Sequence, residues 1–210
     1  FRAVPLPGPA ATWFEIDVLK FDQQFLSVLS LIGSGLTLAG MFVLRPVLAK
    51  HSLAYVIAVL AVASAVLSLP NIALYFGIDA WTAAQTGGIV DARFIALVDT
   101  TLESPLGQIA MIPMLAWIAK NAPIELKATF FAVMASFTNL ALSASSLGTK
   151  YLNQVWVVAR EVREPATGAL VAAADYSQLG WLLISVTFIS AALPLTIIGI
   201  VQKSALRTQD

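Results

Sequence analysis

The stretch DTTLESPLGQIAMIPMLAWI, residues 99–118, is apolar along most of its length but begins with two carboxylates, Asp99 and Glu103. Residues four positions apart lie on one face of a helix, so both acids are predicted to point the same way. About 20 mostly apolar residues are enough to cross a lipid bilayer as a helix. The stretch therefore indicates a transmembrane helix that carries two ionisable groups on one face.

The composition of the whole chain supports a membrane environment. Of its 210 residues, 59% are hydrophobic and only 11% are charged, and the mean hydropathy is +0.84. Soluble domains carry about 25% charged residues. A soluble protein with this composition would expose a large apolar surface to water, so a lipid bilayer is the expected environment for much of the chain.

Five segments are long and apolar enough to span a bilayer, and short polar loops separate them. We therefore expect an all-α membrane protein with a five-helix transmembrane bundle over residues 23–203 and a cytoplasmic tail over residues 204–210. The predicted spans are Gln24–Leu44, Ala54–Phe76, Phe94–Ala119, Ala128–Val158 and Leu179–Val201.

The first 22 residues form a different kind of segment, which begins FRAVPLPGPAATWFEIDVL. Proline lacks a backbone N–H and breaks helices. We expect residues 1–22 to hold the end of a helix broken by Pro5, Pro7 and Pro9, followed by an outer loop. The chain has no initial Met and no recognisable signal peptide, so we interpret it as a fragment of a longer protein.

Basic residues predict the orientation of the bundle. Three alternating connections hold six of the twelve Lys and Arg residues, and positive loops favour the cytoplasmic side. We expect these connections in the cytoplasm and a multi-pass protein of the plasma membrane or an organelle inner membrane. The six residues are Arg45, Lys50, Lys120, Lys127, Lys203 and Arg207.

Several classes of function are disfavoured by composition and motifs. Twelve basic and twelve acidic residues leave no net charge, which speaks against a nucleic-acid partner. With no cysteine and one histidine, His51, thiol catalysis and multi-histidine metal sites are excluded. The sequence has no nucleophile elbow and no phosphate-binding glycine loop. We therefore expect neither an enzyme nor a cofactor.

The acids in the third span leave two interpretations open. Asp99 and Glu103 either reach water at the membrane interface or face a hydrated cavity inside the bundle. A charged group at the centre of a helix costs roughly 2.5–3.5 kcal/mol on insertion. Two carboxylates this close repel each other when both are ionised, so one of them readily takes up a proton. The second interpretation therefore suits a proton-coupled carrier.

Weakly polar residues on the fourth predicted span are also ambiguous. Thr129, Ser136 and Asn139 recur at helical spacing along one face. Small and polar residues allow helices to approach closely and to hydrogen-bond across the contact. An amide in mid-membrane both donates and accepts hydrogen bonds, so Asn139 either joins two helices or lines a pore.

Three groups of residues carry a resemblance to a known family. Asp99 with Gly107-Gln108 and Pro113 resembles the tenth helix of the folate–biopterin transporter family, a branch of the major facilitator superfamily. Ala122-Pro123 and KATFFAVMASFTN resemble the family's loop into helix eleven and the first half of that helix. VLKFDQQFL is similar to the entry into helix eight.

The resemblance implies a fold and a function. The chain would be the C-terminal half of a major-facilitator fold, comprising the end of helix seven and helices eight to twelve, and its N-terminal half would be missing. The parent would be a secondary active transporter that moves a folate- or pterin-like solute together with protons by alternating access. Glu103 departs from the family pattern, which has an apolar residue there, so the solute need not be a folate.

The resemblance also assigns residue roles. Asp99 would be the leading proton or substrate carboxyl, and Glu103 would modulate it. Thr129, Ser136 and Asn139 would line the cavity or fix helix eleven against helix eight. Arg2 would either meet the negative charge of a folate or lie at the membrane interface. The alternative is a non-transporting membrane scaffold or assembly subunit, in which both acids have structural partners.

Overall fold

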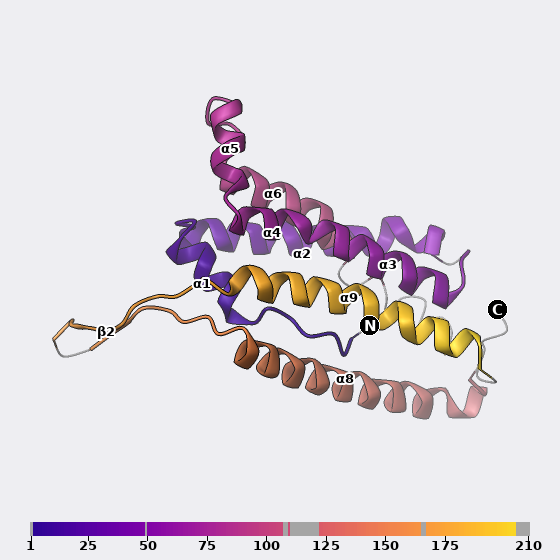
Figure 1. Ribbon diagram of the computed structural model, residues 1–210. Coiled ribbons are helices and arrows are strands. Elements are labelled where there is room, and N and C mark those ends of the chain that lie inside the picture. The colour runs from indigo at the N-terminus through magenta and orange to yellow at the C-terminus, as the bar shows by residue number, and fades with distance from the viewer. Residues whose placement is uncertain (1, 49, 107–108, 110–121, 165–166, 205–210) are drawn as a thin grey trace.

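The computed structural model describes residues 2–48, 50–106, 109, 122–164 and 167–204 (Figure 1). Helices make up most of this part of the chain, and two short 3₁₀ turns and one small hairpin complete it. The α-helices are α1 (Pro9–Asp17), α2 (Gln23–Leu48), α3 (Leu53–Leu67), α4 (Leu69–Tyr75), α5 (Ile78–Gln85), α6 (Ala92–Glu103), α8 (Lys127–Val155) and α9 (Leu179–Gln202). The 3₁₀ turns are η1 (Ser104–Leu106) and η2 (Ile124–Leu126).

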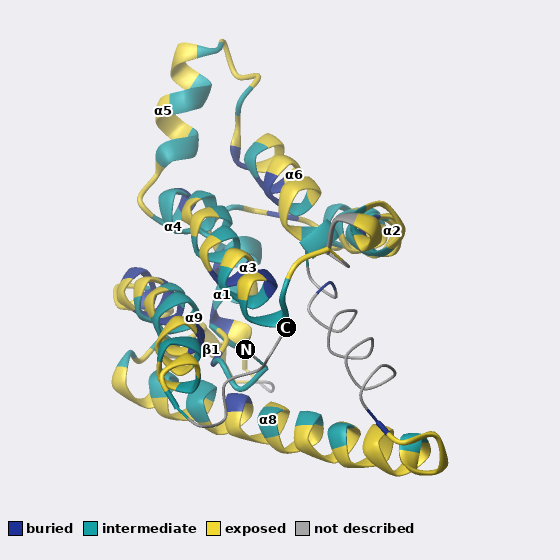
Figure 2. Cartoon of the chain, turned by 90° about the vertical axis from the view of Figure 1, so that its right-hand side faces the viewer, coloured by how far each residue is buried: buried dark blue, intermediate teal, exposed yellow. Residues whose placement is uncertain are grey.

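Within the described residues, four helical segments are long and apolar enough to cross a membrane. They are Gln23–Pro46, Leu53–Tyr75, Ile124–Val155 and Leu179–Gln202, and they correspond to four of the five predicted spans. Large apolar side chains on α2 and α8 are exposed (Figure 2), as expected where lipid or further helices cover them. The prediction of an all-α membrane protein is thus confirmed.

The remaining predicted span, Phe94–Ala119, is described only in its first half, as α6 and η1. Its second half lies outside the described residues, and with it lie Gly107, Gln108 and Pro113 from the family resemblance. The same holds for residues 205–210 of the predicted tail.

The long helices run side by side, so the ends of the molecule differ (Figure 1). The last turns of α2 and α9 and the first turns of α3 and α8 lie at one end. This end carries four basic residues of the predicted cytoplasmic connections, Arg45, Lys50, Lys127 and Lys203. At the opposite end lie α1, the projecting α5 and the hairpin. The arrangement agrees with the predicted alternation of the loops.

The N-terminal segment differs from its prediction in one respect. Pro9 does not break a helix but begins α1. Proline suits the first turn of a helix, where its missing N–H would have no intrahelical acceptor and its fixed φ is already helical. The chain before α1 runs along α8 and is bound to it, because Ser145 Oγ donates to the Val4 carbonyl at 2.6 Å and Leu6 N donates to Thr149 Oγ1 at 2.9 Å.

The second predicted span is not one helix but two, α3 and α4, which meet at Ser68. Pro70, in the first turn of α4, has no N–H to continue the ladder of α3. The Ser68 hydroxyl bonds the Ala65 carbonyl at 2.9 Å and lies 3.0 Å from Thr187 Oγ1 of α9. This turn therefore places polar groups between α3 and α9.

A small hairpin, β1 (Val162–Arg163) and β2 (Leu170–Ala172), lies in the predicted loop between α8 and α9. The sequence pattern does not predict it. Its strands are too short for an alternating pattern. The register is irregular, with Val162 opposite Ala172 and Arg163 opposite Leu170.

The base of this hairpin is bound to α1 by Asp17. Arg160 donates two hydrogen bonds of 2.8 Å to the Asp17 carboxylate, and the Tyr176 hydroxyl donates a third at 2.6 Å. The bonds from Arg160 and Tyr176 hold the pKa of Asp17 below its usual value. Burial, followed by the bond to Asp17, raises the pKa of Tyr176 to about 12. Asp17 thus joins the end of α1 to the segment that enters α9.

The contact to Asp17 predicts the alkaline titration of Tyr176. Its folded pKa lies above the ordinary value of about 10, so its stabilising effect is complete below pH 10 and is lost as the pH rises through about 12. In a spectrophotometric titration of tyrosinate, Tyr176→Phe is expected to remove an ionisation near pH 12. Tyr151→Phe, a change at an exposed tyrosine, is the control and should retain it. An unchanged high-pH phase in Tyr176→Phe would contradict the assignment.

Close backbone contact fixes α2 against the end of α6. A Cβ added at Gly40 would lie 2.5 Å from the Pro105 carbonyl oxygen, and one at Gly33 would lie 3.0 Å from Ser104 Oγ. Between them, Thr37 Oγ1 donates to the Ser104 carbonyl at 2.8 Å. Only a residue without a side chain fits at Gly40, because its neighbour there is backbone.

Gly40→Ala is expected to destabilise the protein by about 1–3 kcal/mol through overpacking. The matched control is Gly35→Ala in the same helix, where an added Cβ would meet nothing within 4 Å. This control should be neutral or gain up to about 1 kcal/mol in helix propensity. Thermal unfolding in detergent, followed by tryptophan fluorescence, measures both. Equal melting temperatures for the two variants would refute the contact.

Candidate functional site

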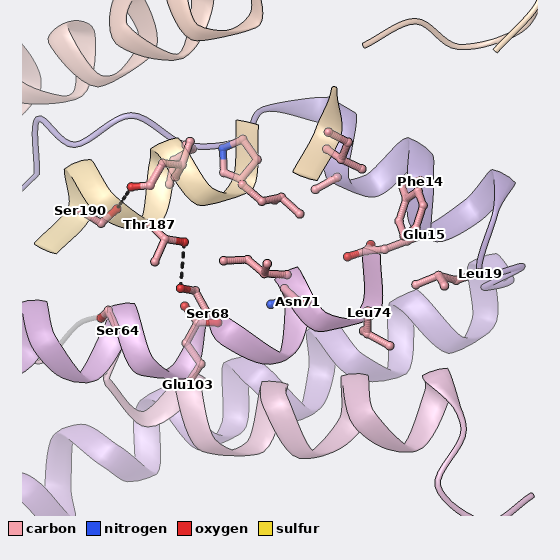
Figure 3. A pocket seen from close by; sticks show the side chains of 17 residues that line it. Phe14, Glu15, Leu19, Ser64, Ser68, Asn71, Leu74, Glu103, Thr187 and Ser190 are labelled. Carbon is pink, nitrogen blue, oxygen red and sulfur yellow. Dashed lines mark hydrogen bonds between the residues drawn. The ribbon is translucent and has the colours of Figure 1, made fainter. Parts of the chain in front are cut away.

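A cavity of about 290 Å³ lies between α1, α3, α4, α6 and α9 (Figure 3). Ligand pockets of proteins usually enclose about 300–1,000 Å³, so this one is near the lower limit. Part of its wall is apolar, formed by residues such as Phe14, Leu74, Leu183 and Val186. The cavity is therefore a place where a small solute could leave water and contact both apolar and polar groups.

The polar part of the wall comes from two helical segments that face each other. Ser64, Ser68 and Asn71 belong to the α3–α4 segment, and Thr187 and Ser190 belong to α9. The hydrogen bond between Ser68 and Thr187 joins these walls (Figure 3). Asn71 can both donate and accept hydrogen bonds, so this wall can orient a polar ligand.

Two acids reach the cavity from different helices. Glu15 comes from α1 and Glu103 from the last turn of α6, and Asn71 lies between them in Figure 3. Glu15 is half-buried, whereas Glu103 is exposed where it lines the cavity. Among the described residues that line the cavity there is no Lys, Arg or His. The site is therefore acidic.

Asp99 lies behind this wall and is only 6% exposed. Asn71 Nδ2 donates a hydrogen bond of 2.7 Å to Asp99 Oδ2, while Asp99 Oδ1 is buried and has no hydrogen-bond partner among the described residues. Asp99 also interacts electrostatically with Glu15 and Glu103. A buried charge without full compensation is costly, and Asp99 is the described residue of the site that has a buried side-chain oxygen without a partner.

The structure thus brings together two of the predicted site residues. Glu103 lines the cavity, and Asp99 is hydrogen-bonded to the lining residue Asn71. Arg2 is half-buried but does not line the cavity.

The three predicted residues of α8 lie elsewhere. Thr129, Ser136 and Asn139 are exposed on α8, outside the cavity wall. Ser136 Oγ donates to the Ala132 carbonyl within its own helix at 3.0 Å. Their predicted contact with helix eight is not among the described interactions, so their roles remain predictions.

Two functional candidates, Glu15 and Asn71, are not among the site residues predicted from the sequence. Glu15 follows the prolines and was assigned to the end of a broken helix. Glu15 shares a helix face with Ala11 and Phe14, which line the same cavity, but this spacing does not show what the face packs against. Asn71 is 28 residues from Asp99, and no local spacing predicts that contact.

The Asn71–Asp99 pair can be tested by a double-mutant cycle. Asn71→Leu leaves the buried carboxylate without its donor and should cost about 1.5–3 kcal/mol of stability, as loss of a hydrogen bond to a charged group does. Asp99→Leu in that background removes the unpaired group and should recover part of the loss. Unfolding in detergent measures all four proteins. Strictly additive effects would show that the two side chains are not coupled.

The fold and the cavity define a helical membrane protein with a small acidic site enclosed among its apolar helices. Comparison with known sequences identifies the group more closely. The profile of the BT1 family matches residues 4–210, and the chain therefore belongs to the BT1 family.

One curated relative is the folate-biopterin transporter of Synechocystis sp. (strain ATCC 27184 / PCC 6803 / Kazusa), which is 25% identical over 214 residues. The similarity covers 100% of this chain and 38% of the relative. The chain thus spans well under half the length of that protein. No solved structure matches.

Proposed function

We propose that this chain is the C-terminal part of a secondary active transporter that moves a folate- or pterin-like solute, coupled to protons, by alternating access. It would contribute the end of helix seven and helices eight to twelve of a major-facilitator fold. Membership of the BT1 family and the name of the Synechocystis relative support the transport of such a solute. The remainder of the transporter would supply the opposite wall of the site.

The observation that carries this proposal is the acidic cavity within the apolar bundle, backed by the buried Asn71–Asp99 pair. Ionisable groups inside membrane segments are expensive and usually mark a pathway for solutes or protons. Asp99 has no cationic partner among the described residues. A proton on its carboxyl would remove the buried charge, and Asn71 would connect that event to the cavity wall.

Two helix irregularities next to the cavity support movement there. The α3–α4 segment turns at Ser68, and α9 contains Pro194. Proline leaves the carbonyl four residues earlier without its helical donor, which here is the carbonyl of Ser190, a cavity residue. Interrupted helices at the substrate site are a common feature of transporters.

The proposal also assigns roles to polar residues on α8 and to Arg2 near the N-terminus. We assign Thr129, Ser136 and Asn139 to the face of α8 that meets the rest of the transporter, and Arg2 to a solute's negative charge outside the cavity. The protein would be a multi-pass protein of the plasma membrane or an organelle inner membrane, without a cofactor and without enzymatic activity.

The alternative is a membrane scaffold that transports nothing. The hydrogen bond between Asn71 and Asp99 favours it, because this bond could serve only to fasten α4 to α6. A scaffold predicts that neutral replacement of Asp99 harms folding. A transporter predicts that the same change harms uptake and its pH dependence.

Uptake of labelled pterin and folate by the full-length protein at two pH values tests the proposal. Wild type should take up at least one of the two solutes, faster at the more acidic outside pH. Asp99→Asn keeps the size of the side chain but removes its proton exchange, so uptake should lose its pH dependence. The control is Asp79→Asn on the projecting helix α5, which should behave as wild type. No uptake of either solute by normally expressed wild type would refute transport.

A further inference from the structure

The charges around the cavity are unbalanced, and this imbalance restricts what can bind. Glu15 and Glu103 line the cavity and Asp99 lies directly behind it, while no described lining residue is basic. Carboxylates only accept hydrogen bonds when ionised. A ligand that binds against this wall is therefore favoured when it supplies N–H donors or positive charge, and a carboxylate placed against the wall is repelled.

A second, independent observation concerns the buried acceptor. Asp99 is more than nine-tenths buried, yet its Oδ1 has no hydrogen-bond partner among the described residues. Its other oxygen is held by Asn71, which itself lines the cavity. Buried polar atoms nearly always have a partner, so this wall has more acceptor capacity than the described chain satisfies.

The described acids do not form a metal-binding cluster. Among the described residues, no group of three His, Cys, Asp or Glu side chains lies close enough to hold a metal ion. The acids approach the cavity from separate helices, α1 and α6. Such spacing suits a flat molecule with donors along one edge better than a point charge.

We propose that the cavity selects an uncharged pterin without a carboxylate over a folate, and that Glu15 is a specificity-determining residue for it. This inference rests on the proposed function and narrows its solute. The amino group and ring N–H of a pterin form a donor edge that a carboxylate accepts with two parallel hydrogen bonds. Glu15 and Glu103 would hold this edge, and the serines and threonine of the facing wall would contact the ring's acceptors.

The described part of the cavity, about 290 Å³, has room for a bicyclic ring. The selection depends on charge, because a carboxylate that enters this part of the cavity would lie near Glu15 or Glu103, where like charges repel. A solute without that carboxylate avoids the repulsion.

Competition against the uptake of labelled biopterin by the full-length transporter tests the proposal at fixed pH. The matched pair of competitors is 6-hydroxymethylpterin and pterin-6-carboxylate, which differ mainly in one negative charge, and folate is the third competitor. In wild type, the neutral pterin should compete at least about tenfold better than either anion, the effect of one charge-assisted hydrogen bond or one repulsive pair. Equal competition by the neutral and the anionic pterin would overturn the selection.

The role of Glu15 is tested by Glu15→Gln. Affinity for the neutral pterin should fall about tenfold or more, and the preference over pterin-6-carboxylate should narrow, since one negative charge is gone. Glu125→Gln is the control, because Glu125 is exposed in η2, outside the cavity. An unchanged preference in normally folded Glu15→Gln would remove Glu15 from the site.

The outcomes separate this inference from the proposed function. If folate and pterin-6-carboxylate compete with biopterin uptake as strongly as the neutral pterin does, transport stands and the selection is wrong. If it transports neither, the proposed function itself fails. The wild-type competition needs no variant, so the selection is decided even if Glu15→Gln does not fold.

Discussion

The arrangement of this bundle depends on a carboxylate held away from water between apolar helices. Asp99 is almost fully buried, and a hydrogen bond from Asn71 offsets part of the cost of burying its carboxylate. The Asn71 side chain that binds Asp99 belongs to α4, the new helix that starts after the turn at Ser68. The break in the second span and the buried acid of the third are thus parts of one arrangement.

The sequence predicts those features that depend on local composition. Segment length and hydropathy alone determine where a chain can cross a bilayer, and the predicted Leu179–Val201 differs from α9 by one residue. The turn at Ser68 was missed because Pro70 lies in an apolar run that is long enough to span. The hairpin was missed because strands of two and three residues leave no periodic signal.

The site shows the same division between local and long-range information. Glu103 could be found from its spacing to Asp99, which is a property of one helix. Glu15 could not, since its place beside the cavity depends on how α1 folds back against α9. That packing is made by Phe14, which joins Leu179, Leu182 and Val186 in one buried cluster. Only the tertiary structure shows that Glu15 and Glu103, which are 88 residues apart in the sequence, line the same cavity.

The distribution of ion pairs connects this architecture to movement. The ion pairs among the described residues are Arg93–Asp22, Arg160–Asp17 and Arg163–Glu161. All lie at the end of the molecule that holds α1, α5 and the hairpin. At the opposite end, Arg45, Lys50, Lys127 and Lys203 form no ion pair with another described residue. Arg93–Asp22 and Arg160–Asp17 thus join separate segments at one end by charge, and no described ion pair does so at the other end.

Exposed ion pairs contribute little stability each, so these ion pairs can break without a large change in free energy. Under the proposed alternating access, the described state would be closed at the end held by Asp17. Opening there would require Arg160 and Tyr176 to release Asp17, which ends the helix that also carries Glu15. Because α1 bears both residues, a movement that breaks the outer contact would also displace a carboxylate of the cavity. The closure of the outer end and the occupation of the site would then be linked through a single short helix.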